Sequence, residues 1–140
     1  MLFRDFTLKI EGDFLKTITL KQPWASLVAN GYKLYEFRSW KIKYRGDILI
    51  HAGKGIDSEA MEKVKELNLD YPSSKIVAMV TIEDCIELND KINKKISQEN
   101  PLIYGNKNRT GYAWKLSNIR KLNCAENVSG KQGFWNYDLK

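Results

Sequence analysis

Residues 17–40 read Thr-Ile-Thr-Leu-Lys-Gln-Pro-Trp-Ala-Ser-Leu-Val-Ala-Asn-Gly-Tyr-Lys-Leu-Tyr-Glu-Phe-Arg-Ser-Trp, and the periodicity of this stretch changes twice. Thr17–Leu20 alternates β-branched and aliphatic residues, which favours a strand. From Pro23 the apolar residues recur at helical spacing, and Gly31 suits the left-handed conformation that ends a helix. Aromatic and charged residues then alternate as far as Arg38. The stretch therefore predicts a strand, a short helix and a second strand.

The rest of the chain adds more strands than helices. Further strands are expected at 41–45, 47–52, 76–82, 111–116, 119–122 and 133–137, and further helices after Asp57 and over 89–98. Helices of crossover length do not alternate regularly with the strands, which argues against a doubly wound parallel sheet. We expect an α+β or mainly β fold, a small mixed β-barrel with two or three short helices.

Charge is distributed unevenly along a chain whose 140 residues suffice for one domain. The formal net charge is +6, and a hydrophobic content of 43% excludes intrinsic disorder. Residues 1–56 carry ten basic and five acidic side chains, 57–104 carry six and ten, and 105–140 carry seven and two. The basic surplus therefore lies in the two end segments, and the fold determines whether they meet.

No membrane segment or cofactor is expected from the composition. Apolar runs fall far short of the ~20 residues that cross a bilayer, and residues 1–10 are unlike a secretory signal, so we expect a cytoplasmic protein without membrane contact. Cys85 and Cys124 lie far apart and are expected to be reduced thiols that pack as small apolar groups. His51 is the only histidine. We therefore expect neither a metal nor another cofactor.

Lys33, Glu36 and Arg38 form the first candidate site. Strand alternation places Glu36 and Arg38 on one face, with Lys33 close to them. A carboxylate between two cations can accept a base's exocyclic amine, while the arginine holds a phosphate or a base edge. On composition alone the alternative is a solvated ion-pair ladder of little energetic weight.

The four tryptophans divide between packing and recognition. Trp24, on the apolar face of the first helix, is expected in the core, and Trp114 and Trp135 are expected to pack inside the barrel. Trp40 stands among basic residues, where stacking on an unpaired base is plausible chemistry.

Several ordered motifs are similar to those of the ASCH domain (activating signal cointegrator homology), in its cointegrator-like branch. They are Gln22-Pro23-Trp24-Ala25, the Gly31-x-Lys33-x-x-Glu36-x-Arg38-Ser39-Trp40 block, Tyr44-Arg45-Gly46, Ile50-His51-Ala52, and Gly111-Tyr112-Ala113-Trp114 with Gly130 and Trp135. The resemblance runs from about Thr17. It divides the chain into an extension, residues 1–16, expected to pack on the domain, and a single domain, residues 17–140.

The resemblance implies a PUA-like barrel with a helix after the first strand and a cleft lined by the Lys33–Arg38 segment. It implies binding of RNA or single-stranded nucleic acid, with a cleft for a nucleotide or modified base. Adjacent first and last strands would then join the two basic segments into one basic side. The expected nucleic-acid contacts are Lys21, Gln22, Lys33, Glu36, Arg38, Trp40, Lys41, Lys43, Arg45, His51 and Lys54.

One branch of the family implies an enzymatic alternative. It resembles amidohydrolases that deacetylate N4-acetylcytidine with a Lys, a Thr and a Glu. Lys33 holds the lysine position, but Glu36 stands where the threonine would be, and Glu99 is the candidate third group. This departure counts against that mechanism, although Glu36 with Lys33 could activate a water in a hydrolase or ribonuclease. A protein-interaction module of the coactivator type is a third, weaker alternative.

Overall fold

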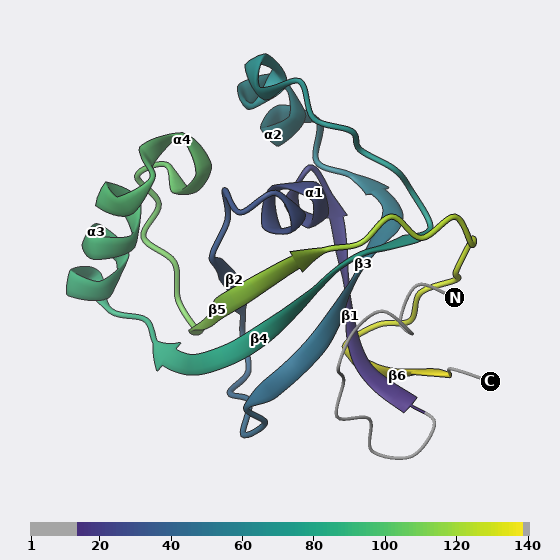
Figure 1. Ribbon diagram of the computed structural model, residues 1–140. Helices are drawn as coiled ribbons and strands as arrows, with labels where there is room; N and C mark the ends of the chain where they lie inside the picture. Colours follow the sequence, from purple (N-terminus) through teal and green to yellow (C-terminus); the bar gives the residue numbers. More distant parts are fainter. Residues whose placement is uncertain (1–13, 139–140) are drawn as a thin grey trace.

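The computed structural model describes residues 14–138 as one curled sheet with short helices around it (Figure 1). The elements in chain order are β1 (Phe14–Gln22), α1 (Trp24–Ala29), β2 (Tyr35–Arg38), β3 (Gly46–Ile56), α2 (Ser58–Lys63), the 3-10 turn η2 (Lys65–Leu67), β4 (Lys75–Glu87), α3 (Asp90–Glu99), α4 (Pro101–Tyr104), β5 (Tyr112–Lys121) and β6 (Phe134–Asp138). The expected order of strand, helix and strand at the start of the domain is confirmed.

The six strands form a mixed sheet in the order β2-β5-β4-β3-β1-β6. β1 runs parallel to β3, and the other pairs are antiparallel. The mixed, barrel-like fold class expected from the sequence is therefore confirmed. Because β1 pairs with β6, the basic segments at the two ends of the chain do lie side by side.

Side chains connect the two edges of the sheet. Over residues 14–138 the backbone ladders leave β2 and β6 as edges. Arg38 Nη2 on β2 donates to the Thr19 carbonyl on β1 at 3.3 Å. The rings of Trp114 on β5 and Phe134 on β6 also meet, with centroids 6.1 Å apart. Arg38 therefore helps to hold the curled sheet together as well as facing the candidate site.

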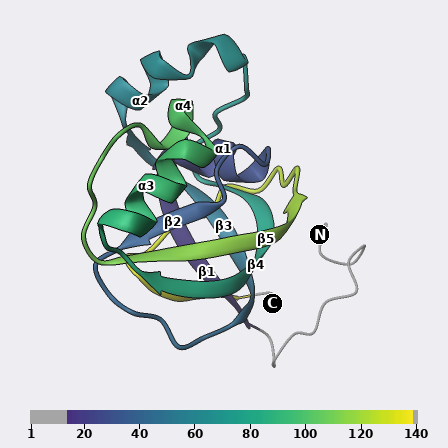
Figure 2. The same cartoon turned by 90° about the vertical axis from the view of Figure 1, so that its left-hand side faces the viewer.

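Three hydrophobic clusters stabilise the fold, and two of them hold helices to the sheet. The first fills the inside of the curl, where Ile48 and Ile50 of β3 meet α1 and Trp114. The second joins α1 and the residues around η2 to α3, α4 and the outer face of β2 and β5, the side seen in Figure 2. The third lies on the outer face of β1, β3 and β4, where Leu49 packs beneath Leu122. Both faces of β3 are therefore buried, as its apolar run predicts.

The structure corrects four expectations of detail. Residues 41–45 form an irregular segment rather than a strand. The strand β2 ends at Arg38 with β5 as its partner, and two carbonyls of residues 41–45 accept from Arg45 Nη1 instead of from a neighbouring strand. Their alternation arises because Ile42 inserts into the core while its lysine neighbours stay exposed. The strands expected at 111–116 and 119–122 are one strand, β5, and the described residues contain four short α-helices rather than two or three.

The fourth correction concerns the expected extension. β1 already begins at Phe14, so residues 14–16 belong to the sheet and pair with β6. The remainder of the extension, residues 1–13, lies outside the described part of the chain. Among residues 14–138, the helices are too short and too polar to cross a bilayer.

Candidate functional site

Two ion pairs share one carboxylate at the start of β2. Lys33 Nζ donates to Glu36 Oε1 at 2.8 Å, and Arg38 Nε donates to Glu36 Oε2 at 3.0 Å. Glu36 and Arg38 are two residues apart in the strand and so share a face. The Lys33 backbone N–H donates to the Leu27 carbonyl in α1, which anchors the lysine beside that face. The predicted juxtaposition of the three charges is therefore present in the structure.

Lys33 is a buried cation, with only 3% of its surface exposed. Its ammonium also donates to the Tyr35 carbonyl and lies over the Phe37 ring, 5.2 Å from the centroid. Burial lowers the pKa of Lys33, and the contact with Glu36 opposes this shift in part. A surface ion-pair ladder would not show such burial, so the pair is an integral part of the fold around a cleft.

A hollow of about 290 Å³ opens beside Lys33. Side chains from α1, β2, α4 and the segments before β2, α2 and β5 line it, namely Trp24, Lys33, Glu36, Phe37, Asp57, Ile103, Tyr104, Lys107 and Arg109. We call it the Arg109 pocket. A second hollow of about 290 Å³, lined by Thr19, Leu20, Lys21, Trp24, Glu36 and Arg38, adjoins it. Trp24 and Glu36 line both hollows, so together they form one candidate cleft.

Trp24 lies at the border of the cleft rather than wholly in the core. Its side chain is partly buried against the core, and Nε1 donates to Asp57 Oδ2 at 3.3 Å. Asp57 Oδ1 in turn accepts from the Ala60 N–H and caps α2. Trp24 therefore packs against the core, as expected, and also lines the pocket.

Arg109 lines the pocket but was not among the residues predicted from the sequence. Its guanidinium stacks on Phe37 at 4.1 Å, and Nη2 donates to the Tyr104 carbonyl at 2.9 Å. Sequence reasoning also left Asp57, Tyr104 and Lys107 out of the site. The available signal was the basic pair Lys107 and Arg109 directly before the Gly111–Trp114 block.

The exposed segment after β2 carries a second group of predicted contacts. Trp40 is 37% exposed and meets the buried Trp114 ring edge-to-face, with centroids 4.8 Å apart. Lys41 and Lys43 are exposed beside it. The guanidinium carbon of Arg38 also lies over the Trp114 ring, 6.0 Å from its centroid. Trp114 thus connects the cleft to the exposed segment.

The other predicted contacts are spread over the molecule. Lys21 and Lys54 are exposed, and Lys21 lines the second hollow of the cleft. Gln22 is buried, and its amide donates to Ser26 Oγ and to the Pro72 carbonyl, both at 2.8 Å. The structure therefore places Gln22 in an internal hydrogen-bond network that holds the start of α1.

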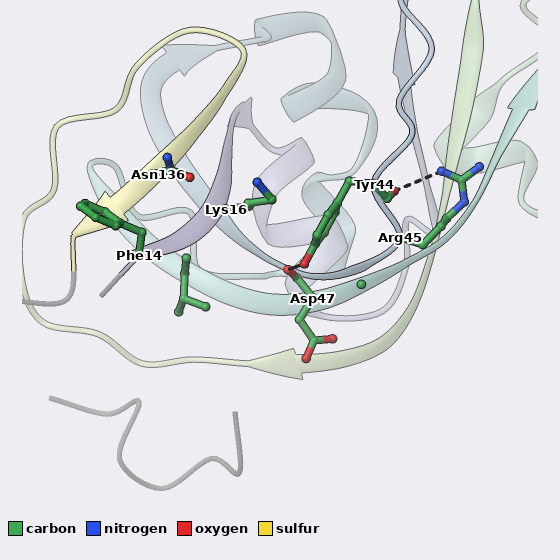
Figure 3. A pocket seen from close by; sticks show the side chains of 8 residues that line it. Phe14, Lys16, Tyr44, Arg45, Asp47 and Asn136 are labelled. Atoms are coloured by element: carbon green, nitrogen blue, oxygen red, sulfur yellow. Dashed lines mark hydrogen bonds between the residues drawn. The ribbon is translucent and has the colours of Figure 1, made fainter. Parts of the chain in front are cut away.

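Arg45 lines a different hollow, at the opposite end of β1 (Figure 3). This hollow, of about 490 Å³, is lined by Phe14, Leu15, Lys16, Tyr44, Arg45, Gly46, Asp47 and Asn136. The Tyr44 hydroxyl donates to the Asp47 carbonyl at 2.9 Å, and Lys16 Nζ lies 5.2 Å from the Tyr44 ring centroid. Arg45 is therefore separated from the cleft by the length of β1.

Glu99 does not join Lys33 and Glu36. It is an exposed residue at the end of α3, and it is not among the residues that line the Arg109 pocket. Its partner is Tyr35, whose pKa is raised to about 12 by burial and, next, by the hydrogen bond to Glu99. The three candidate catalytic residues thus separate into the Lys33–Glu36 ion pair and a carboxylate on α3 that pairs with Tyr35.

His51 is buried on the outer face of β3. Its Nε2 lies 2.6 Å from the Val128 carbonyl and must donate to it, because a carbonyl can only accept. Nδ1 of the neutral ring therefore accepts from Thr19 Oγ1 at 3.1 Å, and Thr19 Oγ1 in turn accepts from Trp135 Nε1. The imidazole therefore holds the segment before β6 against the sheet, and His51 does not line either hollow of the cleft.

Acidification is expected to weaken the fold through His51. Burial lowers the pKa of His51 below its ordinary 6.5, and the hydrogen bond to Val128 offsets this in part. Between the lowered pKa and 6.5 the unfolded chain binds a proton that the folded chain does not, so the free energy of unfolding falls as the pH falls through this window. Urea unfolding at several pH values measures the slope.

The matched control is His51→Gln, which removes the only imidazole of the chain but keeps a donor for Val128. We expect a shallower dependence on pH below 6.5 in this variant. An identical slope in both proteins would contradict the assignment.

Comparison with known proteins gives a matching family model and relatives that agree with it. The family model of the ASCH domain matches residues 18–126, which include the Gln22–Ala25 and Gly31–Trp40 motifs but end before Gly130 and Trp135. Activating signal cointegrator 1 of Mus musculus is 25% identical over 135 residues, and that of Homo sapiens is 27% identical over 135 residues. Each alignment covers 88% of this chain and 22% of the relative, so the chain spans about a fifth of the length of these proteins.

Proposed function

The chain belongs to the ASCH domain family, and from this premise we propose that it binds single-stranded nucleic acid, RNA in the first place, in the cleft between Trp24 and Arg109. The observation that carries the proposal is the convergence of cations from the two basic end segments on one aromatic-lined cleft. Lys33 and Arg38 come from the first segment, and Lys107 and Arg109 from the last. Such a convergence suits a ligand with phosphates and planar bases.

The carboxylates in the cleft are already engaged by donors of the protein. Glu36 accepts from Lys33 and Arg38, and Asp57 accepts from Trp24 and the α2 backbone. Their repulsion of a phosphate is thereby reduced, while the exposed Lys107 remains able to contact one. The net effect favours a polyanion.

The exposed segment after β2 extends the cleft as a contact surface. The free part of the Trp40 ring can stack on an unpaired base, and the flanking lysines can reach phosphates on either side of it. Stacking on a single exposed ring tolerates any base, so this surface supports affinity rather than sequence preference.

Removing Lys41 and Lys43 is expected to lower the salt dependence of RNA binding. Each phosphate contact on a single strand contributes roughly 0.7 to the slope of log K against log salt, so the double variant Lys41→Gln, Lys43→Gln should lose about 1.4. Fluorescence anisotropy with a labelled single-stranded RNA over a salt series measures this.

The matched control is Lys94→Gln with Lys95→Gln, which removes two exposed charges from α3. This control should keep the wild-type slope. Equal slopes in all three proteins would remove the exposed segment from the interface. If RNA does not bind to the wild-type protein at all, the proposed function falls.

A second candidate is hydrolysis of an acylated nucleoside or of RNA, favoured by the lowered pKa of the buried Lys33 next to a carboxylate. Incubating wild type and Glu36→Gln with N4-acetylcytidine and with labelled RNA tests it, under conditions where near-ultraviolet circular dichroism shows the variant folded. Turnover that depends on Glu36 would establish a hydrolase. The absence of turnover would leave binding as the function.

A further inference from the structure

A third hollow adjoins the candidate cleft on the outer face of β1 and β3. It has a volume of about 500 Å³ and is lined by Thr19, His51, Gly53, Lys54, Ser74, Ser129, Gly130, Lys131 and Gln132. We call it the Lys131 hollow. Thr19 also lines the second hollow of the cleft, so the two spaces meet at this residue of β1. The Arg109 pocket, the second hollow and the Lys131 hollow therefore follow one another, and each shares a lining residue with the next.

The floor of the Lys131 hollow is held in place by internal contacts. The Thr19 hydroxyl donates to His51 Nδ1, and His51 Nε2 donates to the Val128 carbonyl. The backbone of Gly130 lies directly against this pair, because a Cβ there would be 2.6 Å from Thr19 Oγ1 and 2.7 Å from His51 Cε1. The Val128 N–H also donates to the Ser74 carbonyl at 2.8 Å. The floor therefore has no side-chain donor left for a ligand, and it positions the backbone that carries the rim.

The rim of the Lys131 hollow is basic. Among the described residues that line it, the charged ones are both lysines, Lys54 and Lys131, and both are exposed. The salt bridges formed within residues 14–138 involve neither of them. In the cleft, by contrast, Glu36 engages Lys33 and Arg38. The two rim lysines are therefore available to an anionic ligand.

Lys21 bridges the gap between the cleft and this rim. It is exposed, lines the second hollow, and takes no part in the salt bridges of residues 14–138. Its aliphatic chain lies against Gly55, where a Cβ would be 3.0 Å from Lys21 Cγ. Gly55 directly follows Lys54, so Lys21, Lys54 and Lys131 lead from the cleft to the outer face of the sheet.

The chemistry of the Lys131 hollow suits a sugar–phosphate backbone better than a base. Tryptophan, tyrosine and phenylalanine are absent from its described lining, and the buried His51 ring meets Trp135 edge-to-face instead of offering a stacking face. The neutral side chains on the rim are the hydroxyls of Ser74 and Ser129 and the amide of Gln132. Hydroxyl, amide and lysine donors are those that commonly contact phosphate oxygens, and they do so without reading the base.

We propose that the Lys131 hollow binds the sugar–phosphate backbone of a nucleic-acid strand whose neighbouring nucleotides occupy the cleft, with Lys21, Lys54 and Lys131 contacting phosphates. The inference rests on the proposed function and adds a path to it. The strand leaves the cleft over Thr19 and runs toward the segment before β6. A strand long enough to reach the Lys131 hollow therefore binds more tightly than one that fills the cleft alone.

The test compares a short and a longer oligouridylate. The short one has about three nucleotides, and the longer one has roughly nine, within the usual site size of single-strand binding modules. Salt titrations compare wild type, the double variant Lys54→Gln, Lys131→Gln, and the charge control Lys94→Gln, Lys95→Gln on α3. For the longer strand we expect the slope of log K against log salt to fall by about 1.4 in the Lys54, Lys131 variant, at roughly 0.7 for each phosphate contact. The control should keep the wild-type slope, and all three proteins should bind the short strand equally.

The outcomes separate this inference from the proposed function. If the longer strand binds to wild type and to the Lys54, Lys131 variant with the same slope, the path is wrong and nucleic-acid binding stands. If the variant weakens binding of the short strand as much as that of the longer one, the Lys131 hollow is not an extension of the cleft. If neither strand binds to wild type, both proposals fall.

A second measurement needs no variant. Nuclear magnetic resonance of the wild-type protein should show the backbone amide signals of residues 129–132 and 53–55 shifting when the longer oligouridylate is added and staying in place with the short one. Unchanged signals with the longer strand bound, or equal shifts with both strands, would overturn the proposed path.

Discussion

Replacing Glu36 with glutamine is expected to lower the free energy of unfolding by about 3–5 kcal/mol, because the buried Lys33 ammonium then lacks its counter-charge. The loss is large compared with the total stability of a domain, roughly 5–15 kcal/mol. Urea unfolding followed by circular dichroism measures it at neutral pH.

The double variant Lys33→Met, Glu36→Leu separates the destabilisation caused by an unpaired buried charge from the net contribution of the ion pair to the free energy of unfolding. Replacing both members of a buried pair by apolar groups is often neutral or stabilising, so we expect the double variant to recover much of the stability lost in Glu36→Gln. Equal losses in the two proteins would show that packing at β2, not the unpaired ammonium, is responsible.

Alkaline pH should partly rescue Glu36→Gln. Burial lowers the pKa of Lys33 below 10.5, and the variant loses the carboxylate that opposes this shift. Between the lowered pKa and 10.5 the unfolded chain binds the proton that the folded chain has lost, so the free energy of unfolding rises with pH in this window. The window starts at a lower pH in the variant than in wild type, and it disappears when Lys33 is removed.

Replacing Trp114 with alanine is expected to cost about 3–5 kcal/mol, the usual penalty for removing a large aromatic side chain from a core. Trp114 is fully buried inside the curl, and its ring contacts both Trp40 and Phe134. Its loss would therefore open the contact between the two edges of the sheet beside the cleft. Chemical denaturation and the near-ultraviolet signal of the remaining tryptophans report the effect.

Trp114→Phe is the matched control. It keeps most of the apolar volume and removes Nε1, which is buried without a hydrogen-bond partner among residues 14–138. A change that conserves most of the volume costs less than about 1.5 kcal/mol, and the loss of an unpaired donor offsets part of that. A phenylalanine variant as unstable as the alanine variant would refute this account of the site.

Local periodicity was sufficient for most of the fold. β-branched alternation located β1, the spacing from Pro23 located α1, and the apolar run after Gly46 located β3. It was misleading at residues 41–45, because a single buried residue between exposed lysines produces the same alternation as a strand. Whether such a segment pairs depends on a neighbour that lies far away in sequence.

The candidate site could be predicted only in part, for the same reason. Lys33, Glu36 and Arg38 lie within six residues, so local geometry alone brings their charges together. The sequence could not show whether Glu99 lies near Lys33 and Glu36, because the distance between them depends on how α3 packs on β2. The structure pairs it with Tyr35 instead.

By itself, the sequence determined the family, the mixed strand-rich fold and the carboxylate shared by two cations, since these rest on motifs and on contacts between near neighbours. Only the tertiary structure decided that Lys33 is buried, that Gln22 and His51 serve internal hydrogen bonds, and that Arg109 completes the pocket. Burial and long-range hydrogen bonding depend on the whole packed chain, because they arise from surfaces that meet only after the sheet has curled.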